Sequence, residues 1–288
     1  MTDPTPPGRR DFDALVGPHD DATPTPPERP VRRWPMPTAA IVLAVLGAGT
    51  LVAAALSPGT TGTAPAASPT PAVHAAVSAA PSRAPSPGST AAAYADPQDA
   101  PISQLADPDW VQRVAAAGNI PERALAAYAG AALSVAQTDP ACGIGWNTLA
   151  AIGQVESDHG TIGGAHLDDR GVAIPTIVGI PLDGNGTARI PDTDHGQYDG
   201  DTTWDHAVGP MQFIPSTWAQ AGQDGDKDGT KDVNQIDDAA LAAALHLCDV
   251  GGDLTVAQNW IDAVSAYNDS VDYNNKVAAA ATQYASLP

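Results

Sequence analysis

Residues 146 to 160 have the sequence WNTLAAIGQVESDHG, and this stretch indicates both the fold and the chemistry of the chain. Trp146, Leu149 and Ile152 recur at helical spacing, and the pattern leads to Glu156. Glu156 follows Ile152 by one helical turn, so we expect it on the stripe that faces the core. Burial disfavours an ionised carboxyl, so such a Glu can act as a general acid at neutral pH. The alternative by position alone is a last-turn residue that reaches solvent.

Helix signals recur on both sides of this stretch. Asp107 followed by Pro108 is typical of an N-cap and a first helical position, and Gly118 is expected to end that helix. A second helix is expected from Pro121 to about Gln137. Further helices are predicted over residues 215–221, 236–249, 256–267 and 271–286.

A long insertion separates the third helix from the fourth. Residues 160–208, which we call the flap, are rich in Gly, Asp, Thr and Pro, with one short β-like stretch at residues 173–180. The sequence therefore predicts a mainly α domain over residues 101–288 that carries a loop-rich insertion.

The first hundred residues differ in composition from the rest. The chain has 28 prolines, and they are concentrated in this part. Residues 1–37 lack apolar periodicity and are predicted to form a disordered cytoplasmic tail. Residues 57–100 are mostly Ala, Pro, Ser, Thr and Gly, so we expect a flexible linker that sets the reach of the following domain.

One transmembrane helix is predicted over residues 38–56. This segment carries no charged residue and is long enough to cross a hydrocarbon core of about 30 Å. Arg29, Arg32 and Arg33 lie just before it and no Lys or Arg follows until Arg83, so the positive-inside rule places the C-terminal domain outside the cell. We therefore predict a single-pass signal anchor in the cell membrane. The alternative is a signal peptide cleaved after Ala53–Ala55, which would release a secreted protein.

The charge balance bears on the partners of the chain. The sequence has 33 acidic and 13 basic residues, a formal net charge of −20. Nucleic acid is not an expected partner, because binding to phosphates needs clustered Lys and Arg. The histidines lack a zinc-ligand spacing and no Gly-rich phosphate loop is present, so no cofactor is expected for catalysis.

The chain has two cysteines, Cys142 and Cys248. In an exported protein an even pair is expected to be bridged, so the sequence predicts one disulfide. Two unrelated buried thiols are the alternative.

Three short motifs occur in a fixed order along the foldable part. They are ESDHG at residues 156–160, GPMQFIPSTW at residues 209–218 and AYN at residues 266–268. Together they resemble the signatures of lysozyme-like lytic transglycosylases. With the acidic stretch at residues 192–201, the chain is similar to exported actinobacterial relatives of the membrane-bound lytic murein transglycosylase B family. The resemblance covers roughly residues 105–285.

The resemblance implies a lysozyme-like fold and an enzyme that acts on peptidoglycan. Glu156 would be the sole catalytic acid, protonating the glycosidic oxygen between MurNAc and GlcNAc. The 2-acetamido group of the substrate would stabilise the anomeric cation, and the C6 hydroxyl would close a 1,6-anhydro ring. Such activity would serve cell wall remodelling, and we expect a monomer. The resemblance also implies six substrate-binding residues: Ser157, Met211, Gln212, Phe213, Tyr267 and Asn268.

The same residues are also compatible with simpler roles and with two other functions. Met211 and Phe213 could simply pack, and Tyr267 and Asn268 could simply end a helix. A second carboxylate, from Asp158 or the flap, would favour a muramidase that hydrolyses the same bond. A non-catalytic cell-wall-binding protein is a third possibility, and it would tolerate replacement of Glu156.

A separate acidic motif, DGDKDGT, occupies residues 224–230. Its spacing is that of an EF-hand loop, in which oxygen ligands at alternate positions bind Ca²⁺. Gln235 stands where the loop has its bidentate Glu, and Asp237 could supply that ligand instead. The transglycosylase B family has a similarly lengthened calcium loop. The predicted structural calcium ligands are therefore Asp224, Asp226, Asp228, Thr230 and Asp237, and the alternative is an acidic turn that binds nothing tightly.

Overall fold

A computed structural model describes residues 100–288 of the chain. The predicted tail at residues 1–37, the transmembrane segment at residues 38–56 and nearly all of the linker lie outside the described residues. None of the helices in the described part is long and apolar enough to cross a membrane.

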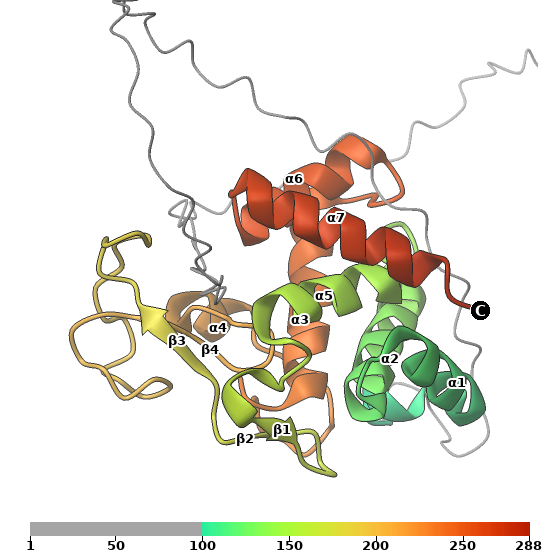
Figure 1. The fold of residues 1–288 in the computed structure, drawn as a ribbon, viewed down its shortest axis with the longest axis horizontal. Coiled ribbons are helices and arrows are strands. Elements are labelled where there is room, and N and C mark those ends of the chain that lie inside the picture. The colour runs from blue at the N-terminus through green and yellow to red at the C-terminus, as the bar shows by residue number, and fades with distance from the viewer. Residues whose placement is uncertain (1–99) are drawn as a thin grey trace, which may run out of the picture. The chain divides into compact units, whose positions relative to one another are not determined.

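The described residues form a mainly helical domain with short strands in the flap (Figure 1). It has seven α-helices: α1 (Pro108–Gly118), α2 (Glu122–Thr138), α3 (Trp146–Ser157), α4 (Pro215–Ala221), α5 (Ile236–Gly251), α6 (Ala257–Tyr267) and α7 (Val271–Ala285). Two 3-10 turns, η2 (Ile102–Gln104) and η3 (Ile162–Gly164), precede α1 and follow α3. The four strands are β1 (His166–Leu167), β2 (Ala173–Ile174), β3 (Val178–Pro181) and β4 (His206–Val208). This architecture is consistent with a lysozyme-like domain.

The core is formed by α2, α3, α5 and α7. The most extensive contacts are those of α3 with α7 and of α2 with α5. Helix α5 is buried on nearly all sides, as expected of a helix whose apolar residues surround its axis. Its many alanines allow neighbouring helices to approach closely. Helix α3 is also buried for most of its length, and its last turn contains Glu156 and Ser157.

The helix ends follow the predicted signals. The carboxylate of Asp107 accepts a hydrogen bond from the backbone N–H of Trp110 at 2.8 Å, which caps α1. Pro215 occupies the first turn of α4, where its missing N–H has no consequence. The predicted helix boundaries agree with the structure to within two residues.

The predicted disulfide is present. Cys142 and Cys248 are bonded, which ties the loop between α2 and α3 to the last turns of α5. The two residues are 106 positions apart, so the chain-entropy model gives the bond about 4 to 5 kcal/mol as an upper figure.

The flap is irregular, as predicted, but its β structure differs from the single stretch expected at residues 173–180. Strands β2 and β3 are separate: β2 pairs with β1, and β3 pairs with β4, each antiparallel. Pro175 explains part of this difference, because it lies between the two strands and lacks the N–H that a continuous strand needs. The β3–β4 pair leads directly into the GPMQ sequence.

Candidate active site

Glu156 lies near the end of α3 and is 2 % exposed, so the solvent-facing alternative is wrong. Its Oε1 accepts a hydrogen bond of 2.7 Å from the hydroxyl of Tyr273. Its Oε2 is buried and has no hydrogen-bond partner among the described residues. Burial raises the pKa of Glu156 to about 8, although the Tyr273 hydroxyl lowers it. The carboxyl therefore keeps its proton at neutral pH, with one oxygen free of protein donors.

Tyr273 is a site residue that the sequence did not indicate. It lies in the first turn of α7 and is 4 % exposed. Burial and the charge of Glu156 raise its pKa well above the ordinary value, so it remains a hydrogen-bond donor. No motif marks this position, because its partner lies 117 residues away in the sequence.

Ser157 is fully buried and connects two of the motifs. Its hydroxyl donates to the carbonyl of Pro210 at 2.5 Å and accepts from the backbone N–H of Gly160 at 2.8 Å. The first contact ties the end of α3 to the GPMQ segment, and the second closes the ESDHG turn. The Ser157 hydroxyl thus both donates and accepts a hydrogen bond within the protein. We therefore assign Ser157 a supporting role behind the site.

The GPMQ segment forms a tight turn between residues 208 and 213. Val208 and Phe213 exchange backbone hydrogen bonds of 2.9 and 3.0 Å. Gly209 has a φ of +78°, and a Cβ there would collide with the carbonyl of Val233, so only glycine fits. Gln212 is 3 % exposed and its side-chain amide donates to the carbonyl of Gly209 at 2.9 Å. The turn is therefore rigid, and it holds Gln212 against its own backbone.

The AYN segment meets this turn from the end of α6. The Tyr267 hydroxyl donates to the carbonyl of Met211 at 2.7 Å, and its ring packs on Phe213 at 5.9 Å between centroids. Burial, and after it the charge of Glu156, raises the pKa of Tyr267 well above its ordinary value. Met211 is fully buried. The structure thus gathers the three motifs around Glu156.

Asn268 ends α6 and connects it to α7. It is 1 % exposed, and its Oδ1 accepts from the backbone N–H of Ser270 at 3.0 Å. Its backbone carbonyl accepts from the side-chain amide of Asn274 at 2.8 Å. These bonds fix the turn that precedes Tyr273, so Asn268 positions the donor of Glu156.

The other carboxylates have different surroundings. Asp158 is exposed, and its Oδ2 accepts from the Thr161 hydroxyl at 3.2 Å. Most of the flap acids accept hydrogen bonds from backbone N–H groups of the flap. Their acceptor oxygens belong to Asp192, Asp194, Asp199, Asp201 and Asp205.

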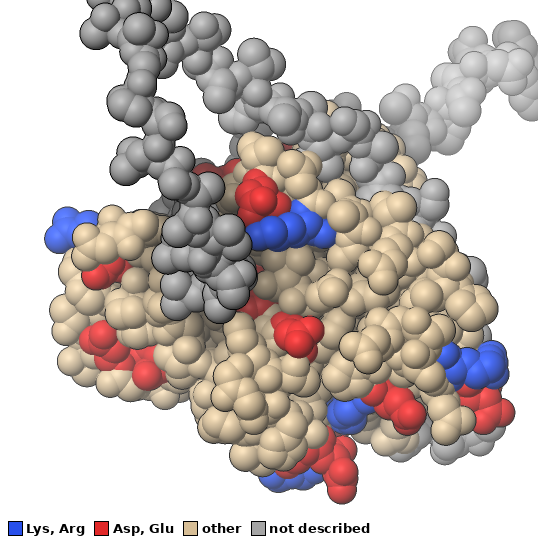
Figure 2. All heavy atoms as spheres, in the orientation of Figure 1, with Lys and Arg blue, Asp and Glu red and all other residues tan. Residues whose placement is uncertain are grey.

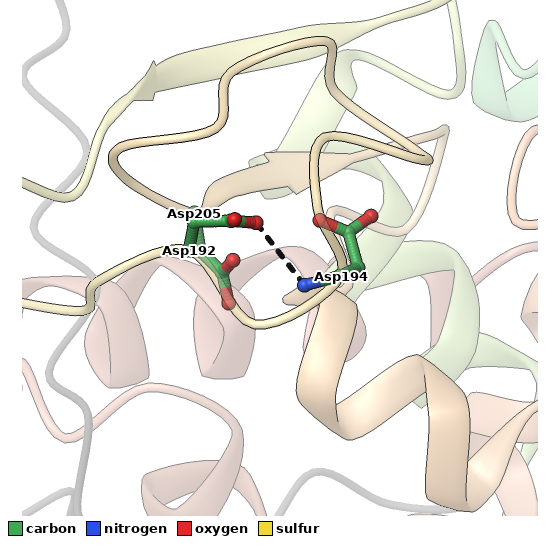
Figure 3. A group of neighbouring side chains, drawn as sticks. All are labelled: Asp192, Asp194 and Asp205. Carbon is green, nitrogen blue, oxygen red and sulfur yellow. Dashed lines mark hydrogen bonds between the residues drawn. The ribbon is translucent and has the colours of Figure 1, made fainter.

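Three of these flap acids gather at one point (Figure 3). Asp192, Asp194 and Asp205 each place a carboxylate oxygen within 4.8 Å of the others. The backbone N–H of Asp194 donates to Asp192 at 3.1 Å, and Thr193 donates to both oxygens of Asp205. These three carboxylates could hold a cation, and they also accept hydrogen bonds from the flap backbone.

The acidic loop after α4 differs in one residue from the predicted set. Asp237 is fully buried, and both of its oxygens accept from Arg123, at 2.7 and 2.9 Å, so it does not face the loop. Asp238 takes that place: it lies within 4.8 Å of Asp224 and Asp226, oxygen to oxygen. The prediction of Asp237 is therefore corrected to Asp238, because the next residue of a helix points about 100° away.

The rest of the loop has the expected shape. Gly229, at the sixth position, has a φ of +91°, which produces the sharp turn. Asp228 and Thr230 are exposed, and Asp228 accepts from the backbone N–H of Thr230 at 2.7 Å. Asp224 Oδ1 is buried without a hydrogen-bond partner, which suits a position beside a bound cation.

The surface shows no concentration of basic residues on the face seen in Figure 2. Lys and Arg there are scattered and lie close to Asp or Glu, and most of the face is uncharged. This face offers no basic patch of the kind that binds nucleic acid.

A mainly helical domain with a buried glutamate at a helix end is consistent with a lysozyme-like domain. Residues 192–252 match the family model of the transglycosylase SLT domain. The matched residues include the second half of the flap, the GPMQ turn, α4 and α5, whereas Glu156 lies outside them. No curated protein and no solved structure matches the chain. The family match supports a lytic transglycosylase, an enzyme that acts on peptidoglycan.

Proposed function

We propose that the described domain cleaves the β-1,4 bond between MurNAc and GlcNAc and forms a 1,6-anhydroMurNAc end. The observation that carries this proposal is the state of Glu156: buried, with a pKa near 8 and one oxygen without a protein partner. A general acid must hold its proton at the working pH and present it to the leaving oxygen. The raised pKa of Glu156 keeps the proton on the carboxyl at neutral pH. The free Oε2 can present this proton to the leaving oxygen.

The reaction needs a proton donor first and a proton acceptor afterwards. Glu156 donates its proton to the glycosidic oxygen, the C1–O bond breaks, and the 2-acetamido group stabilises the anomeric cation. Glu156, now ionised, takes the proton from the C6 hydroxyl, whose oxygen bonds to C1. No water is consumed. The Tyr273 hydroxyl keeps its bond to Oε1 throughout and stabilises the ionised state between the two proton transfers.

The surroundings of Glu156 favour this route over hydrolysis. A glycosidase of the two-carboxylate type needs a second carboxyl about 5 to 9.5 Å from the first. The flap acids are engaged mainly with flap backbone, and Asp158 is exposed. A mechanism in which the substrate supplies its own nucleophile needs no second carboxyl.

Access to Glu156 requires a local movement. The side chain is 2 % exposed in this conformation, and the GPMQ turn beside it is tied down by Ser157 and Tyr267. We infer that glycan binding moves part of the cover of Glu156 and exposes Oε2.

Mass spectrometry of the products released from purified peptidoglycan by the full chain tests this function. We expect muropeptides lighter by one water, and a loss of release in Glu156→Gln of roughly 10²- to 10⁴-fold. Asp158→Asn is the matched control, since it removes an exposed acid two residues away and should change little. Products with a reducing MurNAc end would assign a muramidase. Release that is unchanged in Glu156→Gln would remove the catalytic role.

We also propose that Asp224, Asp226 and Asp238 hold a structural calcium ion. Carboxylate oxygens are the ligands that Ca²⁺ prefers, and Asp224 Oδ1 is buried without a donor. When bound, the ion supplies charge neutralisation and braces the link between α4 and α5. We expect calcium to raise the unfolding temperature of the full chain and to do so far less in Asp224→Asn. An equal rise in both proteins would exclude this site.

The location of the domain remains a proposal from the sequence. The uncharged segment at residues 38–56 and the arginines before it support a membrane anchor with residues 100–288 on the outer side. That is the side on which peptidoglycan lies.

A further inference from the structure

His159 occupies the fourth position of the ESDHG motif and is buried behind the candidate active site. It is 2 % exposed. Its ring lies between two tyrosines from different helices, Tyr128 of α2 and Tyr284 of α7, with centroid distances of 5.8 and 6.0 Å. The mechanism above does not use this residue.

The ring of His159 is hydrogen-bonded to both tyrosines. Nε2 is 3.0 Å from the Tyr284 hydroxyl, and Nδ1 is 3.4 Å from the Tyr128 hydroxyl. Burial lowers the pKa of His159 to about 4, although the charge of Asp158 raises it, so the ring is neutral at neutral pH. A neutral imidazole has one donor and one acceptor, and a hydroxyl can be either. The three side chains therefore satisfy one another without a buried charge.

The backbone at this point is held in an unusual conformation. Asp158 and His159 have φ values of +51° and +59°, in the left-handed region, and Gly160 follows at +83°. A non-glycine residue persists in this region only where its surroundings hold it. The backbone N–H of His159 donates to the carbonyl of Gly153 at 2.9 Å, and its ring is fixed by the tyrosines. The ring thus anchors the turn that ends α3, directly after Glu156 and Ser157.

The same network also fixes the position of α7 along α3. Tyr273, in the first turn of α7, donates to Glu156, and Tyr284, in the last turn, bonds to His159. These tyrosines are eleven residues apart, about 16 Å along a helix. Two ties at opposite ends of one helix set its register. A shift of α7 at Tyr284 would therefore move the phenol that bonds to Glu156.

We infer that His159 is a positioning residue: by holding Tyr284 and the turn after α3, it sets the hydrogen bond between Tyr273 and Glu156. The inference rests on the proposed function only for its consequence in catalysis. The structural link itself can be measured without substrate.

The test is a titration of Glu156 in the full chain. The sequence has three glutamates, Glu28, Glu122 and Glu156, so selective ¹³C labelling of the glutamate carboxyl gives three signals, and Glu156→Gln assigns one. Tyr273→Phe removes the donor and should raise the pKa of Glu156 by about half a unit to one unit. Tyr284→Phe and His159→Phe should raise it in the same direction. The double variant Tyr273→Phe with Tyr284→Phe should shift it no further than Tyr273→Phe alone.

Thr148→Val is the matched control. Thr148 is buried in the first turn of α3 and accepts from the indole N–H of Trp260 at 3.0 Å, so its loss also weakens a helix contact of α3. It should leave the pKa of Glu156 unchanged. Tyr284→Phe removes one hydroxyl and keeps the packed ring, so it supplies the answer if His159→Phe does not fold.

The outcomes distinguish the positioning role of His159 from the proposed glycan-cleaving function. An unchanged or lowered pKa of Glu156 in Tyr284→Phe, or an equal rise in Thr148→Val, would overturn the positioning role. A rise confined to the network supports it even if the wild type releases no anhydro products, which would contradict only the proposed function. Where the wild type is active, we expect kcat in Tyr284→Phe to fall several-fold with KM nearly unchanged.

Discussion

Two carboxyls of this domain are equally buried but differ in their hydrogen-bond donors. Glu156, at the end of α3, is 2 % exposed, and Asp238, in the first turn of α5, is 1 % exposed. Asp238 accepts from the backbone N–H groups of Gly225, Asp226 and Asp232, at 2.6, 3.3 and 2.8 Å. Glu156 accepts from one phenol, and its second oxygen accepts from nothing among the described residues.

The difference shows that burial alone does not define a candidate catalytic acid. Burial raises the pKa of both groups, to about 8 for Glu156 and about 7 for Asp238. The backbone N–H donors around Asp238 lower its pKa and so oppose the effect of burial, whereas the charge of Asp226 raises its pKa further. Those donors fix a loop, so Asp238 is a structural acceptor. Glu156 keeps one oxygen without a protein partner, and a general acid needs such an oxygen to pass its proton to the substrate.

The largest effect should be on the stability of Glu156→Gln. The carboxyl has a pKa near 8 in the fold and about 4.3 when unfolded, so the unfolded chain ionises first as pH rises. The stability from neutral Glu156 is complete below about pH 4.3 and is lost as pH rises to about 8. Because Gln cannot ionise, the variant should gain about 4 kcal/mol relative to the wild type between pH 5 and pH 8.

Chemical denaturation of both proteins at several pH values measures this gain. The other titrating groups are common to the two chains and cancel in the difference. A difference that does not change with pH would mean that Glu156 ionises in the fold as easily as in the unfolded chain. In that case the comparison with Asp238 would lose its basis.

A smaller effect, of opposite sign, is expected for Asp238→Asn. The amide can still accept through its oxygen, but its NH₂ group faces a backbone N–H that has lost its partner. A buried donor without a partner costs about 1 to 3 kcal/mol. We therefore expect lower stability in urea denaturation, with the activity of the folded fraction retained. Lost activity at unchanged stability would mean that Asp238 belongs to the active site.

The smallest effect is expected for Asp272→Asn, which serves as the exposed reference. Asp272 precedes Tyr273 and pairs with Lys276 at 2.7 Å on the surface of α7, where its side chain is 76 % exposed. Exposed pairs of this spacing contribute about 0.3 to 0.5 kcal/mol. A change in urea stability well above that range would show that acids of α7 are coupled to Glu156.

The helical part of the fold could be predicted because its signals are local. Apolar spacing places α3 and α5, while Asp107 and Pro215 mark helix starts through backbone hydrogen bonding alone. The disulfide followed from the count of cysteines. The broken β structure of the flap was missed, because strand pairing there depends on contacts between distant residues.

The candidate site could be predicted only where a motif marked it. Glu156 was indicated by its place on the helical stripe together with the ESDHG motif, and the choice between core and solvent needed the structure. Tyr273 was missed because it meets Glu156 through the packing of α7 on α3, which no local pattern reveals. Asp237 was predicted as a calcium ligand because sequence spacing does not show that its carboxylate accepts hydrogen bonds from Arg123.

The central claim is that buried Glu156 is the proton donor, and the pH dependence of kcat/KM for glycan cleavage tests it most directly. Measured from pH 4 to pH 10, kcat/KM should hold up to near pH 8 and then fall about tenfold per pH unit, since only protonated Glu156 can start the reaction. A fall that begins near the ordinary pKa of a glutamate, about 4.3, would contradict the account.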